Sequence, residues 1–387
     1  MSDTDRAWIE ISRGNLAHNL SELQRLSGPK SALMPAVKAN AYGHGDILTA
    51  GILYGAGIRD FCVATVDEAI RLRKAGISGQ ILILGYTAPD RFRELMHYEL
   101  TQTAVDFSYA GMISGYCIKA DAGKKIRVHV GVDTGMHRLG IPYDRPELIR
   151  EIWGLRGLDV TGIFSHLCVS DGTTEAEERY TNGQMSRFRR VTEYLHMSGI
   201  RGFQTHIQGS YGLLNYPGYS CGLARPGIAL YGCLSSQNDQ VKADADLRPV
   251  LSLKARIASV KELKAGESAG YGLTYTAGTD RKIAIVTAGY ADGIPRSLSN
   301  CGTALVRGRK VPVIGRVCMD QLTLDVTETP GAEPGDEVVF IGRSRTDDGK
   351  ACDTAVLTAE DMAQTAGTIT NEILSRLGAR LKRIEME

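Results

Sequence analysis

The sequence predicts an α/β fold of two domains: a (β/α)8 TIM barrel over residues 1–238, then a mainly β domain with a helical tail over 239–387. Three observations predict it. The chain has 387 residues, more than one average domain contains. Short apolar runs alternate with helical segments through the first part of the chain. Beyond it, strand-like runs follow one another with only turn residues between them.

Eight apolar or β-branched runs provide the expected barrel strands, at 31–39, 60–66, 80–86, 99–105, 125–133, 159–167, 201–208 and 227–232. Segments with helical periodicity lie between them, such as 67–76 and 184–199. Gly76 and Gly199 stand where these helices would end. An open doubly wound sheet is the alternative that periodicity leaves. It is weakened because GxGxxG and Walker A spacings are absent.

The second domain is predicted because the spacing of strand-like runs changes near residue 240. The polar segment 235–249 is typical of a linker. Strand-like runs follow at 250–263, 282–293, 303–318, 321–326 and 336–342, and their close spacing favours antiparallel pairing. A helical tail is expected to open at TAED (358–361), which has the pattern of a capping box.

Composition and charge exclude several classes of function. The net charge of +1 argues against a nucleic-acid partner and against a basic membrane-surface binder. The eight cysteines form no CxxC pair and no zinc-like spacing, so we expect no metal and a reducing, cytoplasmic setting. No apolar run is long enough to span a bilayer, and the N-terminus does not resemble a signal peptide.

The predicted strand ends carry polar groups that would meet at one mouth of the barrel, because reactive groups of this fold gather at the C-terminal ends of its strands. A lysine at such a position can form a Schiff base with an aldehyde. Backbone amides beside a glycine, with nearby hydroxyl groups, can hold a phosphate. An arginine can only donate hydrogen bonds, which suits an unprotonated ring nitrogen. The groups are Lys38, Tyr42, Arg138, His166, His206, Ser210, Arg225, Gly227 and the amide of Ile228.

Each of these residues also has an ordinary structural interpretation. Lys38 could be a surface lysine at a strand end, and Arg138 could form a structural ion pair. Either histidine could be a hydrogen-bonded core residue, while Tyr271 and Tyr275 resemble strand aromatics. The joint appearance of these groups at strand ends favours the functional interpretation.

Motifs along the whole chain resemble those of alanine racemases, which are fold-type III enzymes dependent on pyridoxal 5'-phosphate (PLP). The segment AVKANAYGHG (36–45) resembles the cofactor-lysine motif of that family. The likeness continues in the same order through 133–140, 205–210, 224–232, 269–277, 288–296 and 313–321. It implies a barrel followed by a β domain, and a homodimer with shared active sites.

The resemblance also implies roles for individual residues. Lys38 would hold PLP and act as one acid/base group, and Tyr271 of a second subunit would be the other. Arg138 and the amide of Met319 would bind the substrate carboxylate. Arg225, steadied by His206, would face the pyridine nitrogen, and His166 would support the ring. The phosphate would be held by Tyr42, Ser210, Gly227 and Ile228, while Tyr290, Arg296 and Arg316 would line the entrance.

Two positions depart from the family pattern. Gly131 stands where many members carry a carbamylated lysine, seven residues before the phenolate-binding arginine. Asn371 replaces an aromatic residue, usually tyrosine, beside the substrate side chain. Its ordinary interpretation is a favoured residue in the first turn of a helix. Its functional interpretation is an amide that pairs with a substrate hydroxyl, because a site that hydrogen-bonds this group can select serine over alanine.

These features predict a PLP-dependent racemase of L- and D-serine with alanine as a secondary substrate. The combination resembles the serine racemase domains of vancomycin-resistance systems, in which a membrane domain precedes the racemase domain; the chain would then be the part cut from a longer protein at MSDTD. The alternatives are an alanine racemase without serine preference and, more remotely, a PLP decarboxylase on the same architecture. A non-catalytic cofactor carrier and a barrel with a plain binding role are further alternatives. Cys318, beside Met319, could lie near the site or in the core.

Overall fold

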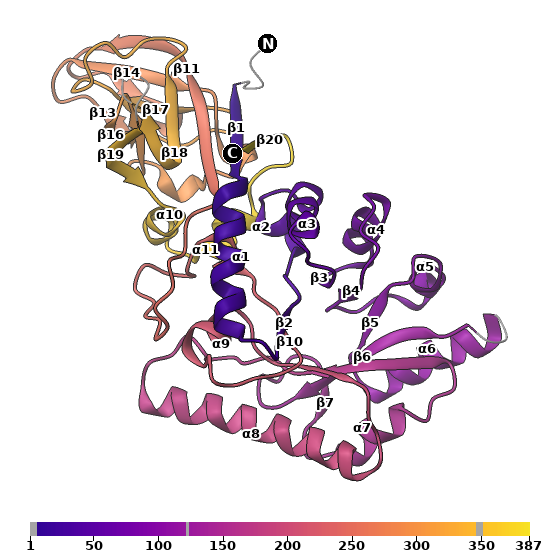
Figure 1. The fold of residues 1–387 in the computed structure, drawn as a ribbon. Helices are drawn as coiled ribbons and strands as arrows, with labels where there is room; N and C mark the ends of the chain where they lie inside the picture. The colour runs from indigo at the N-terminus through magenta and orange to yellow at the C-terminus, as the bar shows by residue number, and fades with distance from the viewer. Residues whose placement is uncertain (1–5, 121–123, 346–350) are drawn as a thin grey trace.

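A computed structural model describes residues 6–120, 124–345 and 351–387 of the chain (Figure 1). It contains two large sheets, one parallel and one mainly antiparallel. The segment MSDTD, where the sequence predicts a cut from a longer protein, lies outside the described residues. No helix within these ranges is both long and apolar enough to cross a membrane.

The parallel sheet forms the predicted barrel and confirms the fold class. Its path ends at β2 on one side and at β3 on the other, and a bridge between Ala36 and Cys62 joins these ends. The amide of Val37 donates to the Cys62 carbonyl at 3.0 Å, and the Cys62 amide donates to that of Pro35 at 2.9 Å. The strands in sheet order are β2 (Ala32–Leu33), β10 (Leu223–Ala224), β9 (Gln204–His206), β8 (Leu158–Phe164), β6 (Ile126–Asp133), β5 (Thr101–Ala104), β4 (Ile81–Ile83) and β3 (Phe61–Val63), with β7 (Ile141–Pro142) beside β6.

Helices cover the outside of this sheet (Figure 1). The two predicted from periodicity are α4 (Val66–Lys74) and α8 (Glu175–Met197), and both open with capping boxes. Gly76 and Gly199 follow them with φ of +93° and +85°, which glycine adopts at least cost. The other helices are α1 (Arg13–Ser27), α3 (Asp46–Gly55), α5 (Phe92–His97), α6 (Phe107–Ala120), α7 (Pro146–Ile152) and α9 (Ser210–Asn215). The short segment α2 (Lys38–Tyr42) is not a regular right-handed helix, because Ala39 to Tyr42 have positive φ.

The eighth predicted strand is wrong. Residues 227–232 do not form a strand; Ile228–Tyr231 is a 3-10 helix, η2, and the eighth strand is the two-residue β10 just before it. All four residues of η2 are buried. A short buried apolar run has no polar face to show its period, so the sequence alone does not separate strand from helix there.

The second sheet confirms the predicted mainly β domain. It curls on itself, because β18 pairs with both β15 and β11. Residues 235–249 contain no helix or strand, as expected for a linker. The predicted capping box is present, with Thr358 as N-cap of α10 and Asp361 as its partner. The elements are β11 (Leu251–Leu263), β12 (Ser268–Ala269), β13 (Tyr275–Thr276), β14 (Arg281–Val286), β15 (Thr303–Val306), β16 (Arg309–Ile314), β17 (Leu322–Asp325), β18 (Glu337–Arg345), β19 (Ala351–Leu357), α10 (Ala359–Ala366) and α11 (Thr370–Ser375).

The β domain also includes a strand from the start of the chain. β1 (Ala7–Ser12) pairs antiparallel with β11 and parallel with β20 (Lys382–Met386), so the first and last strands of the described residues lie side by side in this sheet (Figure 1). From β1 the chain enters α1 directly and runs back toward the barrel. The predicted boundary at residue 238 therefore leaves this strand out of the β domain.

Candidate active site

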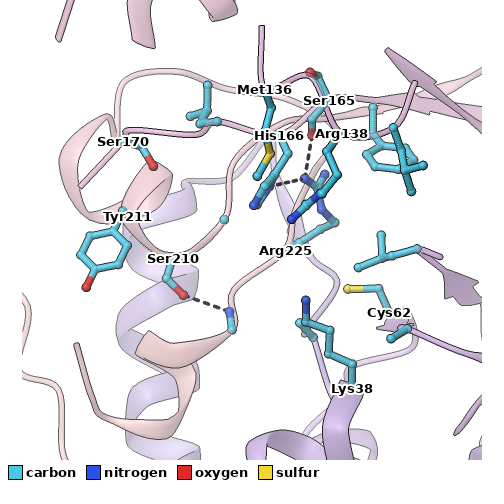
Figure 2. A pocket seen from close by; sticks show the side chains of 18 of the residues that line it. Lys38, Cys62, Met136, Arg138, Ser165, His166, Ser170, Ser210, Tyr211 and Arg225 are labelled. Carbon is cyan, nitrogen blue, oxygen red and sulfur yellow. Dashed lines mark hydrogen bonds between the residues drawn. The ribbon is translucent and has the colours of Figure 1, made fainter. Parts of the chain in front are cut away.

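A cavity of about 460 Å³ opens where the parallel strands of the barrel end. Much of its wall lies at or just after the C-terminal ends of strands, which is where the active sites of this fold lie. Figure 2 shows Lys38, Ser210, His166, Arg138 and Arg225 directed toward this space from different elements. Of the residues predicted for the site, the cavity is lined by Lys38, Tyr42, Arg138, His166, Ser210, Arg225, Gly227, Ile228 and Asn371.

Lys38 opens an unusual turn. The four residues after it, Ala39 to Tyr42, all have φ between +51° and +55°, the left-handed helical region. Each such residue costs about 1–2 kcal/mol relative to right-handed helix when it carries a Cβ. The turn carries the Tyr42 side chain back to the cavity that holds Lys38. Strain of this kind persists where surrounding structure holds it, and it concentrates at functional sites.

Contacts on several sides hold the left-handed turn. The carboxylate of Glu68, from the start of α4, accepts a hydrogen bond from the Ala39 amide at 2.7 Å. The Asn40 side chain accepts from the Asp46 amide at 2.9 Å. Gly43 packs against α11 so closely that a Cβ there would lie 2.0 Å from the Leu374 carbonyl oxygen. The position of Lys38 thus depends on both domains.

One end of the cavity forms a cradle of hydroxyl groups and amides. Ser210 Oγ accepts the Gly227 amide at 2.9 Å and the Ala229 amide at 3.2 Å. The Ile228 amide between them has no hydrogen-bond partner among the residues described. A Cβ on Gly227 would lie 2.6 Å from the Tyr42 hydroxyl, so only glycine leaves this cradle open. Convergent hydroxyls and free amides of this kind suit a phosphate.

Arg225 lies deep in the cavity wall without a carboxylate partner in the described parts of the chain. Its guanidinium donates to His206 Nδ1 at 2.5 Å, to the Ser165 carbonyl at 2.7 Å and to His166 Nδ1 at 3.3 Å. Burial lowers the pKa of Arg225 to about 10. Its Nε–H and one of its two Nη1–H groups form no hydrogen bond with any described residue, so both remain available to a ligand.

The two histidines that contact Arg225 are neutral. Burial, reinforced by the nearby Arg225 cation, lowers the pKa of His166 to about 3 and holds that of His206 well below its usual value. His206 does not line the cavity and lies behind Arg225. His166 does line it, with Arg138 and Lys38 adding to the depression of its pKa.

Arg138 reaches the cavity from the loop that follows β6. The Asp133 carboxylate accepts the amides of Gly135 and His137, and Tyr180 on α8 donates to the Gly135 carbonyl at 2.6 Å. Arg138 itself is exposed and makes no ion pair within the described ranges. Gly131 lines the same cavity and supplies no side chain beside it. The guanidinium of Arg138 is therefore available to an anionic ligand.

Asn371 enters the barrel's cavity from the β domain. It is the second residue of α11, as the sequence predicts for a helix start. The preceding Thr370 is buried and bonds through its amide to the Ser235 carbonyl at 2.9 Å, which ties α11 to the barrel side. The Asn371 Oδ1 is buried and has no hydrogen-bond partner among the described residues. A residue that lines the cavity thus carries a buried, unpaired hydrogen-bond acceptor.

Besides His206, two further residues predicted for the site lie outside this cavity. Tyr271 and Met319 belong to the β domain and are 71% and 53% exposed. Gly272, next to Tyr271, packs against the Arg316 side chain, while the Tyr290 amide donates to the carbonyl of Cys318 at 2.9 Å. Tyr271, Leu273, Tyr290 and Met319 form what we call the exposed loop cluster. Arg296 is also exposed and lines a separate groove with Tyr290.

Sequence reasoning missed several residues of this region, and three of them lie close to Arg225 or His206. Cys62 and Phe164 line the cavity, and His129 lies behind it, 2.8 Å from His206. His129 sits two residues before Gly131 on β6, so strand alternation places both on the same face. That alternation was the available signal for His129. Cys62 and Phe164 stand in apolar runs, where nothing in the sequence separates a cavity wall from the core.

Comparisons with known proteins identify the family of this chain. The alanine racemase N-terminal domain model matches residues 11–235, and the C-terminal domain model matches residues 250–385. An amino-acid racemase of Enterococcus faecalis is 43% identical over 99% of this chain and 52% of its own length. A serine/alanine racemase of Enterococcus gallinarum is 39% identical over 97% of this chain and 51% of its own. The chain thus spans about half the length of these curated relatives.

Other relatives match along their whole length. An alanine racemase of Carboxydothermus hydrogenoformans is 38% identical over 97% of this chain and 98% of its own. The solved structure of an alanine racemase from Clostridium difficile 630 superposes with a TM-score of 0.90 at 32% identity, over 99% of this chain and 96% of that one. With both domain models matched, the chain belongs to the alanine racemase family, whose members depend on PLP.

Proposed function

We propose that this protein is a PLP-dependent racemase that interconverts L- and D-serine, with alanine as a secondary substrate. The observation that carries the choice of serine is the unpaired, buried Oδ1 of Asn371, a residue that lines the same cavity as Lys38. The remaining features of the cavity support the racemase activity itself, whichever of the two amino acids is preferred.

The residues of the cavity fit PLP. Lys38 supplies the amine that would bind it covalently, and Figure 2 shows this side chain pointing into the open space. The cradle of Ser210, Gly227 and Ile228 would take the phosphate, and the Nε–H of Arg225 would donate to the ring nitrogen. When bound, PLP withdraws electrons from the substrate and so acidifies its α-proton.

The protein's own groups would then move that proton. Racemisation removes the α-proton on one face of a planar carbon and returns a proton on the other, so two groups on opposite faces are needed. Lys38 Nζ would serve one face. Tyr271 would serve the other in a partner subunit's cavity, because it is exposed and outside its own. Arg138 would hold the substrate carboxylate.

Asn371 favours serine for a physical reason. Serine and alanine differ by one hydroxyl group, which an apolar pocket distinguishes poorly. A buried acceptor left unpaired costs free energy, which a serine hydroxyl would recover and an alanine methyl would not. The resemblance to a relative named serine/alanine racemase supports the same assignment.

The position of Arg225 argues against the decarboxylase alternative. A buried cation that is held by neutral histidines and carbonyl oxygens can only donate to the ring nitrogen. It would keep that nitrogen unprotonated and the cofactor a moderate electron sink, which suits proton exchange. An alanine racemase without serine preference fits every other feature of the cavity, so the test must address Asn371.

The test compares two substitutions at one position. Asn371→Leu keeps the approximate size and removes the amide, whereas Asn371→Tyr also adds bulk. We expect both to lower the ratio of kcat/KM for L-serine to that for L-alanine by about ten-fold, since one hydrogen bond contributes roughly 1.4 kcal/mol. Chiral chromatography of the products gives the ratio. An unchanged ratio in Asn371→Leu would remove the residue from the specificity argument.

We propose further that the active enzyme is a homodimer with shared sites. The exposed loop cluster presents large apolar side chains to solvent, as interaction surfaces do. A twofold arrangement would give two equivalent sites, each with Lys38 from one subunit and Tyr271 from the other.

Mixing two inactive variants tests the shared site. Lys38→Ala and Tyr271→Phe should each be nearly inactive alone. After subunit exchange at equal concentrations, half of the dimers would be mixed, and each of these would hold one intact site. About a quarter of wild-type activity should then return. Activity that stays at the level of the separate variants, with exchange verified by mass, would contradict a shared site.

A further inference from the structure

From the geometry behind Arg225, we infer that His129 is a positioning residue: it accepts a hydrogen bond from His206, fixes the tautomer of that ring, and so holds Arg225 as a donor toward the cavity. His129 does not line the cavity. Its Nδ1 lies 2.8 Å from His206 Nε2, and His206 Nδ1 lies 2.5 Å from the Arg225 guanidinium. The inference rests on the proposed racemase activity only for its kinetic consequence.

The direction of each hydrogen bond follows from Arg225. A guanidinium only donates, so His206 Nδ1 must carry a lone pair toward it. A neutral His206 then carries its proton on Nε2, which faces His129 Nδ1. His129 Nδ1 must accept that proton's hydrogen bond, and the proton of a neutral His129 is on its own Nε2. Arg225 thus determines the tautomer of His206, and His206 determines the tautomer of His129.

Both rings are buried, which keeps them neutral. His129 and His206 are each 0% exposed, and burial is the largest cause that lowers the pKa of His129 to about 3. The Arg225 cation is the second cause for both rings. A protonated ring would direct an N–H at its donor neighbour, so the relay requires this neutrality.

Packing fixes the orientation of the two rings. Phe164 stacks on His206 with ring centres 4.9 Å apart and planes 4° from parallel. Gly162 on β8 faces His129 so closely that a Cβ there would lie 2.6 Å from its Nε2. The pairing of β6 with β8 shifts register between Val128 and His129, an irregularity of the kind that re-aims a side chain.

The hydrogen-bonded series from Arg225 through His206 ends at His129, with no further partner among the described residues. His129 Nε2 is buried and makes no hydrogen bond with the residues described, so His129 gains no polar contact beyond His206. A histidine that served only in packing would bury the unpaired Nε2–H at a cost in free energy that no other polar contact offsets. The acceptor at Nδ1 is the contact that Arg225 requires, because His206 would otherwise bury an unpaired Nε2–H or move its proton to the nitrogen that faces Arg225.

The test uses the PLP-loaded enzyme and a matched pair of variants. Asparagine places an amide oxygen where histidine has Nδ1, so His129→Asn keeps the acceptor, whereas His129→Leu removes it. The first readout is the tautomer of His206 by nitrogen-15 NMR on histidine-labelled protein, assigned with a His206→Gln variant. The second is kcat and KM with L-alanine.

We expect wild type and His129→Asn to show His206 protonated on Nε2 alone, with kcat within about two-fold of one another. His129→Leu should lose this single tautomer and about ten-fold in kcat at nearly constant KM, as outer-shell partners of a functional group do. Equal losses of kcat in both variants would overturn the inference. So would full kcat in His129→Leu, or a wild-type His206 protonated on Nδ1. The wild-type tautomer decides the matter even if a variant fails to fold, and it is independent of substrate preference.

Discussion

Arg225 shows how single residues define this site. It is a buried cation whose described partners are carbonyl oxygens, two neutral imidazoles and the face of Phe164, 5.1 Å from its ring centre. A buried charge without a counter-ion is costly, and it is kept where function requires it. A neutral acceptor such as a ring nitrogen can take a hydrogen bond from the guanidinium without neutralising its charge. A buried arginine with only neutral partners therefore distinguishes this cavity from one that places an acidic residue against the ring nitrogen to protonate it.

A substitution in the cradle tests the predicted phosphate position. Gly227→Ala places a methyl group against the Tyr42 hydroxyl, which must move away from the cavity. We expect PLP affinity to fall about ten-fold, or roughly 1.4 kcal/mol, when apoprotein is titrated with PLP and followed by fluorescence. Gly51→Ala on α3, where nothing lies within 4 Å of the new Cβ, is the control and should bind normally. Equal affinity in both variants would place the phosphate elsewhere.

Residues within recognisable motifs could be predicted, whereas His129, which lies outside those motifs, could not. Lys38, Ser210 and Arg225 stand at strand ends in recognisable segments, so their convergence follows from the fold. His129 acts through His206, a partner 77 positions away, and no local pattern reports that contact. Asn371 was identifiable because it departs from a pattern; the unpaired state of its Oδ1 emerges only from the packing of α11.

At the scale of elements, the left-handed turn after Lys38 is the most costly feature. Its four non-glycine residues with positive φ need the support of Glu68, Asn40 and α11. The sequence gives no sign of this turn, because alanine favours right-handed helix. The same limit explains η2, where burial hides the period, and β1, whose partners β11 and β20 lie far along the chain. Strongly periodic helices such as α8 were predictable without such information.

A pair of alanine-to-glycine substitutions measures the strain. Ala39→Gly removes an exposed Cβ from a left-handed position. The relief of backbone strain should exceed the extra conformational entropy that glycine loses on folding, so the free energy of unfolding should rise by up to about 1 kcal/mol. Ala17→Gly, at an exposed position of α1, should lower the free energy of unfolding by about 1 kcal/mol. Urea unfolding reports both changes. A loss at position 39 as large as that at position 17 would show that the turn is unstrained.

The whole molecule divides its site between two domains. The barrel supplies Lys38 and the cradle, and α11 of the β domain adds Asn371 to the same cavity. The exposed loop cluster, on other loops of the β domain, lies outside that cavity with Tyr271 and Met319 accessible. In the proposed dimer, the barrel cavity of one chain and the exposed loop cluster of the other would together form one active site, and the twofold arrangement would give two such sites.

The most direct test of the proposed activity is racemisation of L-serine and of L-alanine by the purified, PLP-loaded wild-type protein, followed side by side by chiral chromatography. We predict that kcat/KM for serine is at least equal to that for alanine. A preference for alanine of ten-fold or more would contradict serine specificity and return Asn371 to the role of a helix-start residue. Turnover of neither amino acid would contradict the proposed racemase activity itself.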